Sequence, residues 1–187
     1  GIVALQWLCT HVPSKVICTA PKLEQVKKIM FGEISKQFER LKANSPWPVD
    51  PTPKALELNF GPEWFAFGMT TKESQGQIGK FQGFKSPHLL IVVTEAQRVE
   101  DEIFDQFYGL LPASILELGN PLMPVGRFWQ HCTDPRYGYN VIKFSAFESP
   151  NVIAGREVVP GMATNEFIEE MRRDWGEDHP YWFARVL

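Results

Sequence analysis

One short segment limits what this chain can fold into more than any other part of the sequence. Residues 89–93 read Leu-Leu-Ile-Val-Val, without a polar side chain between them. A strand with one wet face alternates apolar and polar residues, whereas an unbroken apolar run is typical of a strand that is covered on both faces. Such strands occur in parallel sheets, whose neighbouring strands are joined by crossover helices. The segment therefore predicts a layered α/β fold.

Strand-like and helix-like segments alternate on both sides of this run. Residues 15–19 form another short apolar run, and over residues 23–41 apolar side chains recur every three or four positions, which predicts an amphipathic helix. Residues 55–60 and 64–70 are separated by a Gly-Pro-Glu turn and predict a hairpin. The other expected elements are the end of a helix at 4–8, helical segments at 101–111, 126–131, 164–175 and 181–186, and strands at 114–119 and 139–145. This alternation predicts a mostly parallel sheet.

Size and composition fit a single domain. The chain has 187 residues, of which 44% are hydrophobic, and this is enough for a sizeable core. No apolar run approaches the roughly 20 residues of a membrane span, and residues 1–7 lack the features of a signal peptide. The three cysteines have no CxxC spacing and the four histidines are scattered, so we expect reduced thiols and no metal site. The net charge of −3 does not indicate nucleic-acid binding, although transient contact with DNA does not need a basic chain.

Polar residues follow two of the expected strands, where ligands of open α/β sheets bind. Glu95 comes directly after Thr94 at the end of the central run, and Asn120 comes directly after residues 114–119. A carboxylate in that place can orient or deprotonate a water that attacks a phosphoryl group. On position alone, the simpler interpretation of Glu95 is a solvated loop residue, and Asn120 can be interpreted as part of an Asn-Pro turn.

Several short motifs occur in a characteristic order. They are Thr19-Ala20-Pro21 before an amphipathic helix, Thr94-Glu95-Ala96 at the end of the apolar strand, Glu102-Ile103-Phe104, Leu118-Gly119-Asn120-Pro121, Gly126-Arg127-Phe128, the segment 145–152 (Ser-Ala-Phe-Glu-Ser-Pro-Asn-Val) and the segment 181–187. In this order they resemble the ATPase domain of phage terminase large subunits, over nearly the whole chain. The resemblance implies a RecA-like fold of the P-loop NTPase type, a three-layer sandwich with a mostly parallel central sheet, truncated at its N-terminal end. Residues 1–187 would then be a single, partial ATPase domain, and the nuclease domain of the family would be absent.

The resemblance also implies roles for individual residues. The central strand corresponds to the Walker B strand, and Glu95 to the catalytic glutamate that activates water for attack on the γ-phosphate of ATP. Asn120 falls in the coupling motif, which senses the γ-phosphate. Thr19, Ala20 and Pro21 match a motif that lies near nucleic acid in related helicases, although Pro21 as a helix starter explains the segment without DNA. ATP and Mg²⁺ are the implied cofactors.

Three features depart from the family pattern. The chain has no G-x-x-x-x-G-K-[ST] phosphate-binding loop, since residues 76–80 have the wrong spacing and no hydroxyl residue follows the lysine. Thr94 replaces the Walker B aspartate, and a neutral hydroxyl is a weaker ligand near Mg²⁺. The family's arginine that acts on a neighbouring subunit has no counterpart, because the chain offers Lys80 and Lys85 there, and lysine lacks the bidentate fork of arginine.

The motifs together imply the ATPase motor of a viral terminase that packages double-stranded DNA into capsids. Its implied partners are double-stranded DNA, the portal protein, the small terminase subunit and further copies of the chain in a ring, in the host cytoplasm. As it stands, the chain is expected to hydrolyse ATP negligibly, because no loop cradles the β- and γ-phosphates. The alternatives are a non-enzymatic remnant that binds DNA or packaging partners, and a helicase-type ATPase of the same fold.

Overall fold

The chain folds into two compact units, Gly1–Gly119 and Asn120–Leu187. The computed structural model describes residues 1–44, 51–71, 83–120 and 122–187. The division does not test the interpretation of residues 1–187 as one partial ATPase domain, so that interpretation stays a prediction. No helix among the described residues is both long enough and apolar enough to span a membrane.

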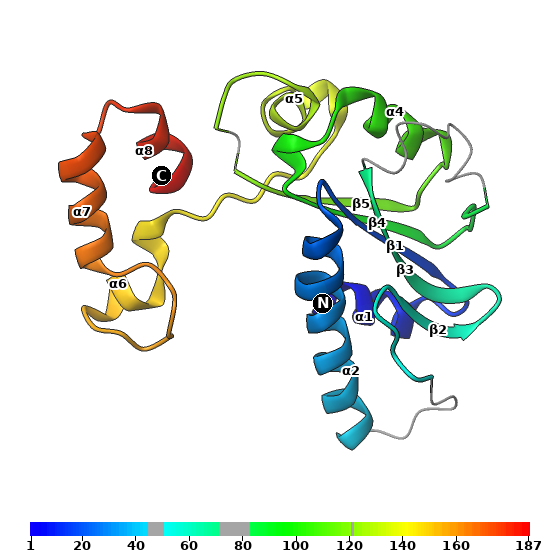
Figure 1. Ribbon diagram of the computed structural model, residues 1–187. Coiled ribbons are helices and arrows are strands. Elements are labelled where there is room, and N and C mark those ends of the chain that lie inside the picture. Colours follow the sequence, from blue (N-terminus) through cyan, green and yellow to red (C-terminus); the bar gives the residue numbers. More distant parts are fainter. Residues whose placement is uncertain (45–50, 72–82, 121) are drawn as a thin grey trace. The chain divides into compact units, whose positions relative to one another are not determined.

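A five-stranded sheet with the order β2-β3-β1-β4-β5 forms the centre of the first unit (Figure 1). Its strands are β1 (Lys15–Ala20), β2 (Glu57–Gly61), β3 (Trp64–Thr70), β4 (Leu89–Thr94) and β5 (Ser114–Leu118). All neighbouring strands run parallel except β2, which pairs antiparallel with β3. The apolar runs of β1 and β4 lie side by side at the centre and are almost completely buried, as unbroken apolar strands require.

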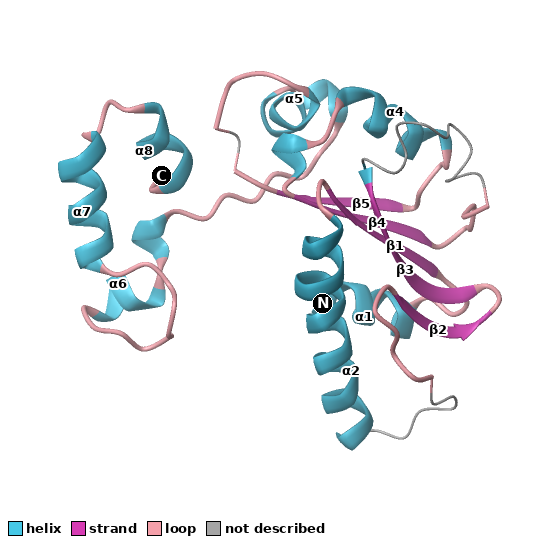
Figure 2. Cartoon of the chain, in the orientation of Figure 1, coloured by secondary structure: helices cyan, strands magenta, loops and turns pink. Residues whose placement is uncertain are grey.

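Helices cover both faces of this sheet (Figures 1 and 2). The elements α1 (Ile2–Thr10), η1 (Gln25–Phe31) and α2 (Gly32–Asn44) lie on one side, and α4 (Asp101–Gly109) lies on the other. Alternate residues of each central strand face opposite layers, so Val16 and Cys18 share a core with Phe31 and Phe38 on the helices. The first unit therefore has the mostly parallel α/β sheet that the alternation of segments predicts, in the three-layer arrangement that the resemblance implies.

Gly68 fixes how closely η1 approaches β3. A Cβ atom at this position would lie 2.7 Å from both Phe31 Cε2 and Val26 Cγ1, on two buried side chains of η1. We expect Gly68→Ala to lower the free energy of unfolding by about 1–3 kcal/mol, because overpacking forces these side chains off their rotamers. Urea unfolding measures the change. Gly61→Ala is the matched control in the same hairpin, since a Cβ there meets no atom within 4 Å; equal losses in both variants would contradict this account of the packing.

Cys18 is inaccessible in the folded state. It lies in the central strand β1, and burial raises the pKa of its thiol from 9.0 to about 12. Because the folded-state pKa is the higher one, the stability from the neutral thiol is complete below pH 9 and is lost as the pH rises toward 12. At pH 8 we expect an alkylating reagent to modify the exposed Cys9 in the native protein, and Cys18 only on unfolding. Mass spectrometry of peptides labelled with and without urea measures this, and rapid native labelling of Cys18 would contradict it.

The second unit is made of short helices, and its described residues contain no strand (Figure 2). Its elements are α5 (Arg127–Thr133), η3 (Pro135–Tyr137), η4 (Ala146–Glu148), α6 (Pro150–Ala154), α7 (Asn165–Trp175) and α8 (Pro180–Arg185). Ile168, Trp182 and Val186 form a small buried core. Because this core is small, hydrogen bonds contribute a larger share of the stability of the second unit.

A buried asparagine organises the loop between α6 and α7. Asn151 is 1% exposed, and its Nδ2 donates to the carbonyl oxygens of Val159 (2.9 Å) and Met162 (3.1 Å). Its Oδ1 accepts from the backbone N–H groups of Val158 (2.7 Å) and Val159 (2.8 Å). The Asn151 amide thus supplies hydrogen-bond partners for backbone groups of this loop that no strand or helix pairs.

Two motifs that are far apart in the sequence meet in this unit. Ser145 Oγ donates to the carbonyl oxygen of Val186 at 2.9 Å, and the backbone N–H of Ala146 donates to the same oxygen at 2.8 Å. Ser145 also caps η4, where the Glu148 carboxylate accepts from the Ser145 N–H. The segments 145–152 and 181–187, both of which carry the resemblance, are therefore joined directly.

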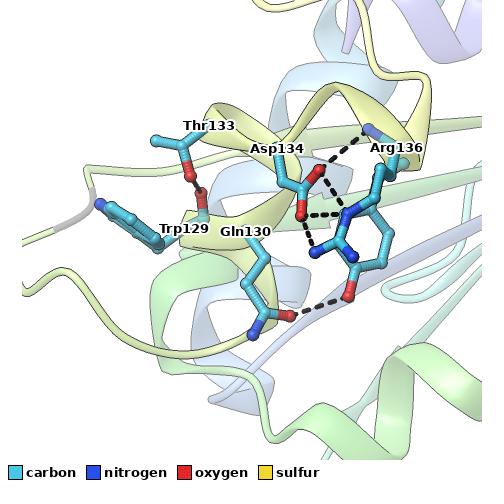
Figure 3. Close-up of polar contacts among 6 residues, drawn as sticks. Trp129, Gln130, Thr133, Asp134 and Arg136 are labelled. Atoms are coloured by element: carbon cyan, nitrogen blue, oxygen red, sulfur yellow. Dashed lines mark hydrogen bonds and ion pairs between the residues drawn. The ribbon is translucent and has the colours of Figure 1, made fainter.

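The corner after α5 is held by polar side chains (Figure 3). Arg136 donates to both carboxylate oxygens of Asp134, and these hydrogen bonds hold the pKa of Asp134 below its usual value. The hydroxyl of Tyr137 donates to Gln130 Oε1 at 3.0 Å, and Thr133 Oγ1 donates to the carbonyl of Trp129 at 2.8 Å. All these contacts are local, so they explain the turn rather than a binding site.

One expectation about secondary structure is wrong, and another is confirmed with a difference. Residues 139–145 form no strand, because the described part of the second unit offers no strand with which they could pair. Instead, the Tyr139 ring stacks on His131 at 4.3 Å, and Phe144 is 85% exposed. The helix expected over residues 23–41 is also not uniform. It contains the π-helical segment η1, in which residues four and five apart, such as Val26, Met30 and Phe31, share the buried face.

Candidate functional site at the carboxyl ends of the parallel strands

Glu95 lies at the carboxyl edge of the sheet, directly after the last residue of β4. In the register of the sheet, Thr94 of β4 lies beside Leu118 of β5, and Val93 lies beside Thr19 of β1. The ends of three parallel strands therefore come together around this position. In open α/β sheets this edge is where ligands bind.

The backbone of Glu95 has a conformation that non-glycine residues rarely adopt. Its φ of 55° and ψ of 39° are left-handed, and it caps the short helix η2 (Ala96–Arg98). The buried Ala96 fixes the start of this helix, and the N–H of Arg98 donates to the carbonyl of Glu95 at 2.9 Å. Such a conformation costs about 1–3 kcal/mol and concentrates at functional sites. The backbone therefore favours the functional interpretation of Glu95 over that of a solvated loop residue.

Two neighbouring side chains contact the Glu95 carboxylate. Gln97 Nε2 donates to Glu95 Oε2 at 3.2 Å, and Arg98 Nε lies 3.6 Å from the same oxygen. Sequence reasoning missed both residues. Gln97 and Arg98 follow Glu95 by two and three positions. This spacing predicts contact with the carboxylate only if a tight helical turn follows the strand, and the sequence alone does not show that turn.

Thr94 is half-buried and turns toward the helical layer. Its Oγ1 donates to Met30 Sδ of η1 at 3.6 Å, and a thioether is a weak acceptor. The even-numbered residues of β4, such as Leu90 and Val92, belong to the same core, so the direction of Thr94 follows from the strand period. Sequence reasoning did not find the Met30 contact.

The remaining predicted residues lie in different environments. Thr19, Ala20 and Pro21 are buried, and Thr19 Oγ1 has no hydrogen-bond partner in the described part of the chain. Their contact with DNA stays a prediction, and their burial does not favour it. Lys85 is exposed, and its carbonyl accepts from Lys15 Nζ at 3.3 Å.

Two predicted residues are not joined to this site by the structure. Lys80 lies outside the described residues. Asn120 is exposed and is the first residue of the second unit, two positions beyond the end of β5. Its coupling role stays a prediction.

The side chains at this edge do not by themselves fit a magnesium nucleotide. Mg²⁺ prefers carboxylates and phosphate oxygens, and Glu95 is the carboxylate of the motif, while the Thr94 hydroxyl is neutral and bonded to Met30. Within the described ranges, no group of three or more His, Cys, Asp or Glu side chains could hold a metal ion. The sequence also lacks the phosphate-binding loop. What the edge does supply is the carboxylate of Glu95, which Gln97 and Arg98 contact.

A five-stranded, mostly parallel sheet between helical layers, with Glu95 directly after a central strand, is consistent with a RecA-like α/β fold. The chain is similar to the solved ATPase domain of the large terminase of Thermus phage P74-26, with a TM-score of 0.53 and 12% sequence identity. The similarity covers 93% of this chain and 77% of that domain, and it shows a common fold. No family model and no curated protein matches the sequence.

Proposed function

We propose that this chain is the core of a terminase-type ATPase motor, in which Glu95 is the general base for ATP hydrolysis. The observation that carries the proposal is the left-handed Glu95 directly after the buried strand β4. The fold shared with a phage terminase ATPase domain supports it. A carboxylate held there deprotonates or orients the water that attacks the γ-phosphate.

The finer parts of the proposal follow from the motifs. The motor translocates double-stranded DNA into a viral capsid, as a ring of copies on the portal protein, with a small subunit that recognises the genome. ATP with Mg²⁺ is the proposed substrate, and Glu95 acts on the attacking water. Asn120 passes the loss of the γ-phosphate to the DNA-gripping elements.

Calorimetry of ATP binding with Mg²⁺ tests this function. The chain 1–187 is compared with the full-length product of its gene, because a phosphate-binding loop upstream of Gly1 would complete the site. We expect ATP to bind and to be hydrolysed only in the full-length product. Binding in neither form would overturn the proposal, and so would turnover by the chain 1–187 that Glu95→Ala does not abolish.

A second candidate function is that of a non-enzymatic remnant that binds DNA or packaging partners. The Thr94 contact favours it, since a hydroxyl that replaces the Walker B aspartate and donates to Met30 is not directed at a metal ion. Under this alternative, neither the chain 1–187 nor the full-length product binds ATP. The full-length product should nevertheless bind a packaging partner or double-stranded DNA in a pull-down with purified components.

A further inference from the structure

We infer that Gln97 is a positioning residue that holds one oxygen of the Glu95 carboxylate, so that the other oxygen takes the proton of the attacking water. The inference rests on the proposed function and assigns a role that the motifs do not give. It starts from two contacts that reach the same carboxylate oxygen, Glu95 Oε2, from Gln97 at 3.2 Å and from Arg98 at 3.6 Å.

The backbone brings these side chains together. The left-handed Glu95 turns the chain sharply out of β4, and η2 then places Gln97 two residues further on, beside the carboxylate. The N–H of Val99 donates to the carbonyl of Ala96 at 3.1 Å and closes the turn. The position of Gln97 is therefore set by the same turn that presents Glu95.

The carboxylate charge fixes the orientation of the Gln97 amide. Only the NH₂ end can donate to Glu95 Oε2, because the opposite orientation would place two oxygen acceptors against each other. Gln97 Oε1 therefore faces away, where it is buried and has no hydrogen-bond partner among the described residues. No described group therefore hydrogen-bonds to Gln97 Oε1 and competes with Glu95 for the orientation of the amide.

The two contacts leave the second carboxylate oxygen for chemistry. Within the described residues, Glu95 Oε1 makes no hydrogen bond or ion pair, whereas Oε2 has both partners. In the hydrolytic step, an O–H bond of water breaks and its proton goes to Glu95 Oε1, while the water oxygen bonds to the γ-phosphorus. The bond between the γ-phosphorus and the bridging oxygen breaks, and its electron pair leaves with ADP. A carboxylate free to rotate would present this oxygen less often.

Steady-state hydrolysis by the full-length gene product tests the role. Gln97→Met keeps the length of the side chain and removes its amide. We expect kcat to fall about tenfold or more, with the KM for ATP unchanged within about twofold, since the amide acts through the base and not on the nucleotide. Gln106→Met on α4 is the matched control, because its Oε1 is also buried and unpartnered in the described part of the chain; it should leave kcat unchanged.

A double-mutant cycle separates positioning from a general effect on structure. In a Glu95→Gln background, Gln97→Met should change kcat no further, because the base on which it acts is gone. An unchanged kcat in Gln97→Met, or an equal loss in both backgrounds, would overturn the inference while the proposed function stands. If the wild-type product does not hydrolyse ATP, the proposed function fails and the inference with it. If Gln97→Met does not fold, Gln97→Leu replaces it, because leucine also removes the amide. The same loss of kcat is expected, and an unchanged kcat contradicts the inference.

Discussion

Replacement of Glu95 with glutamine is expected to lower the ATP turnover of the full-length gene product by about 10²- to 10⁴-fold, the usual contribution of a general base. Glutamine keeps the size of the side chain and its contact with Gln97, so the left-handed turn after β4 should persist. The affinity for ATP should hardly change, because the proposed role of Glu95 is to activate water and not to bind the phosphates. Single-turnover hydrolysis and calorimetry on the same variant measure the two quantities separately.

Glu100→Gln is the matched control for this change. Glu100 is exposed, lies five positions further along, and precedes α4 without a side-chain cap hydrogen bond. Its replacement should leave turnover within about twofold, as expected for a surface carboxylate without a role in the reaction. A loss of less than tenfold in Glu95→Gln, or losses of similar size in both variants, would mean that Glu95 is the solvated loop residue of the alternative interpretation.

Replacement of Asn151 with leucine is expected to lower the free energy of unfolding of the second unit by about 3–5 kcal/mol. The change removes four hydrogen bonds between the Asn151 amide and the backbone of the loop, two to carbonyl oxygens and two from N–H groups. The core around Trp182 is small, so this loss is comparable with the whole stability of a unit of this size. Hydrogen exchange read by mass spectrometry should show loss of protection over α6, α7 and α8.

The first unit should retain its protection in the same experiment, because Asn151 bonds only within the second unit. Asn165→Leu is the control: Asn165 is exposed at the start of α7 and should change stability by less than about 0.5 kcal/mol. If Asn151→Leu loses no more protection than this control, the loop does not depend on the amide.

The sequence predicts those parts of the fold that depend on local periodicity. The unbroken run of β4 and the spacing of apolar residues over 23–41 each follow from how a strand or a helix presents its side chains, and the structure contains both. The place of Glu95 after a buried strand follows in the same way, since strand ends are visible as changes of composition.

Features that depend on non-local partners could not be predicted in this way. Residues 139–145 have the composition of a strand, but a strand also needs a neighbour, and pairing is not visible in a single segment. The contact between Thr94 and Met30 joins residues 64 positions apart in sequence. The left-handed backbone of Glu95 brings Gln97 within hydrogen-bond distance of its carboxylate. The sequence therefore indicates where the candidate site lies, and the three-dimensional contacts show which oxygen of Glu95 is held.

The hydrogen bonds from Ser145 and Ala146 to the Val186 carbonyl have a mechanical consequence. A tensile force applied at Leu187 reaches these two bonds before it reaches the contacts between α7 and α8, because Val186 is the residue next to the point of load. The force thus reaches residue 145 directly, as well as Trp182 of α8, whose carbonyl accepts from the N–H groups of Val186 and Leu187. Part of a pull on Leu187 therefore reaches residue 145 without passing through α6 and α7.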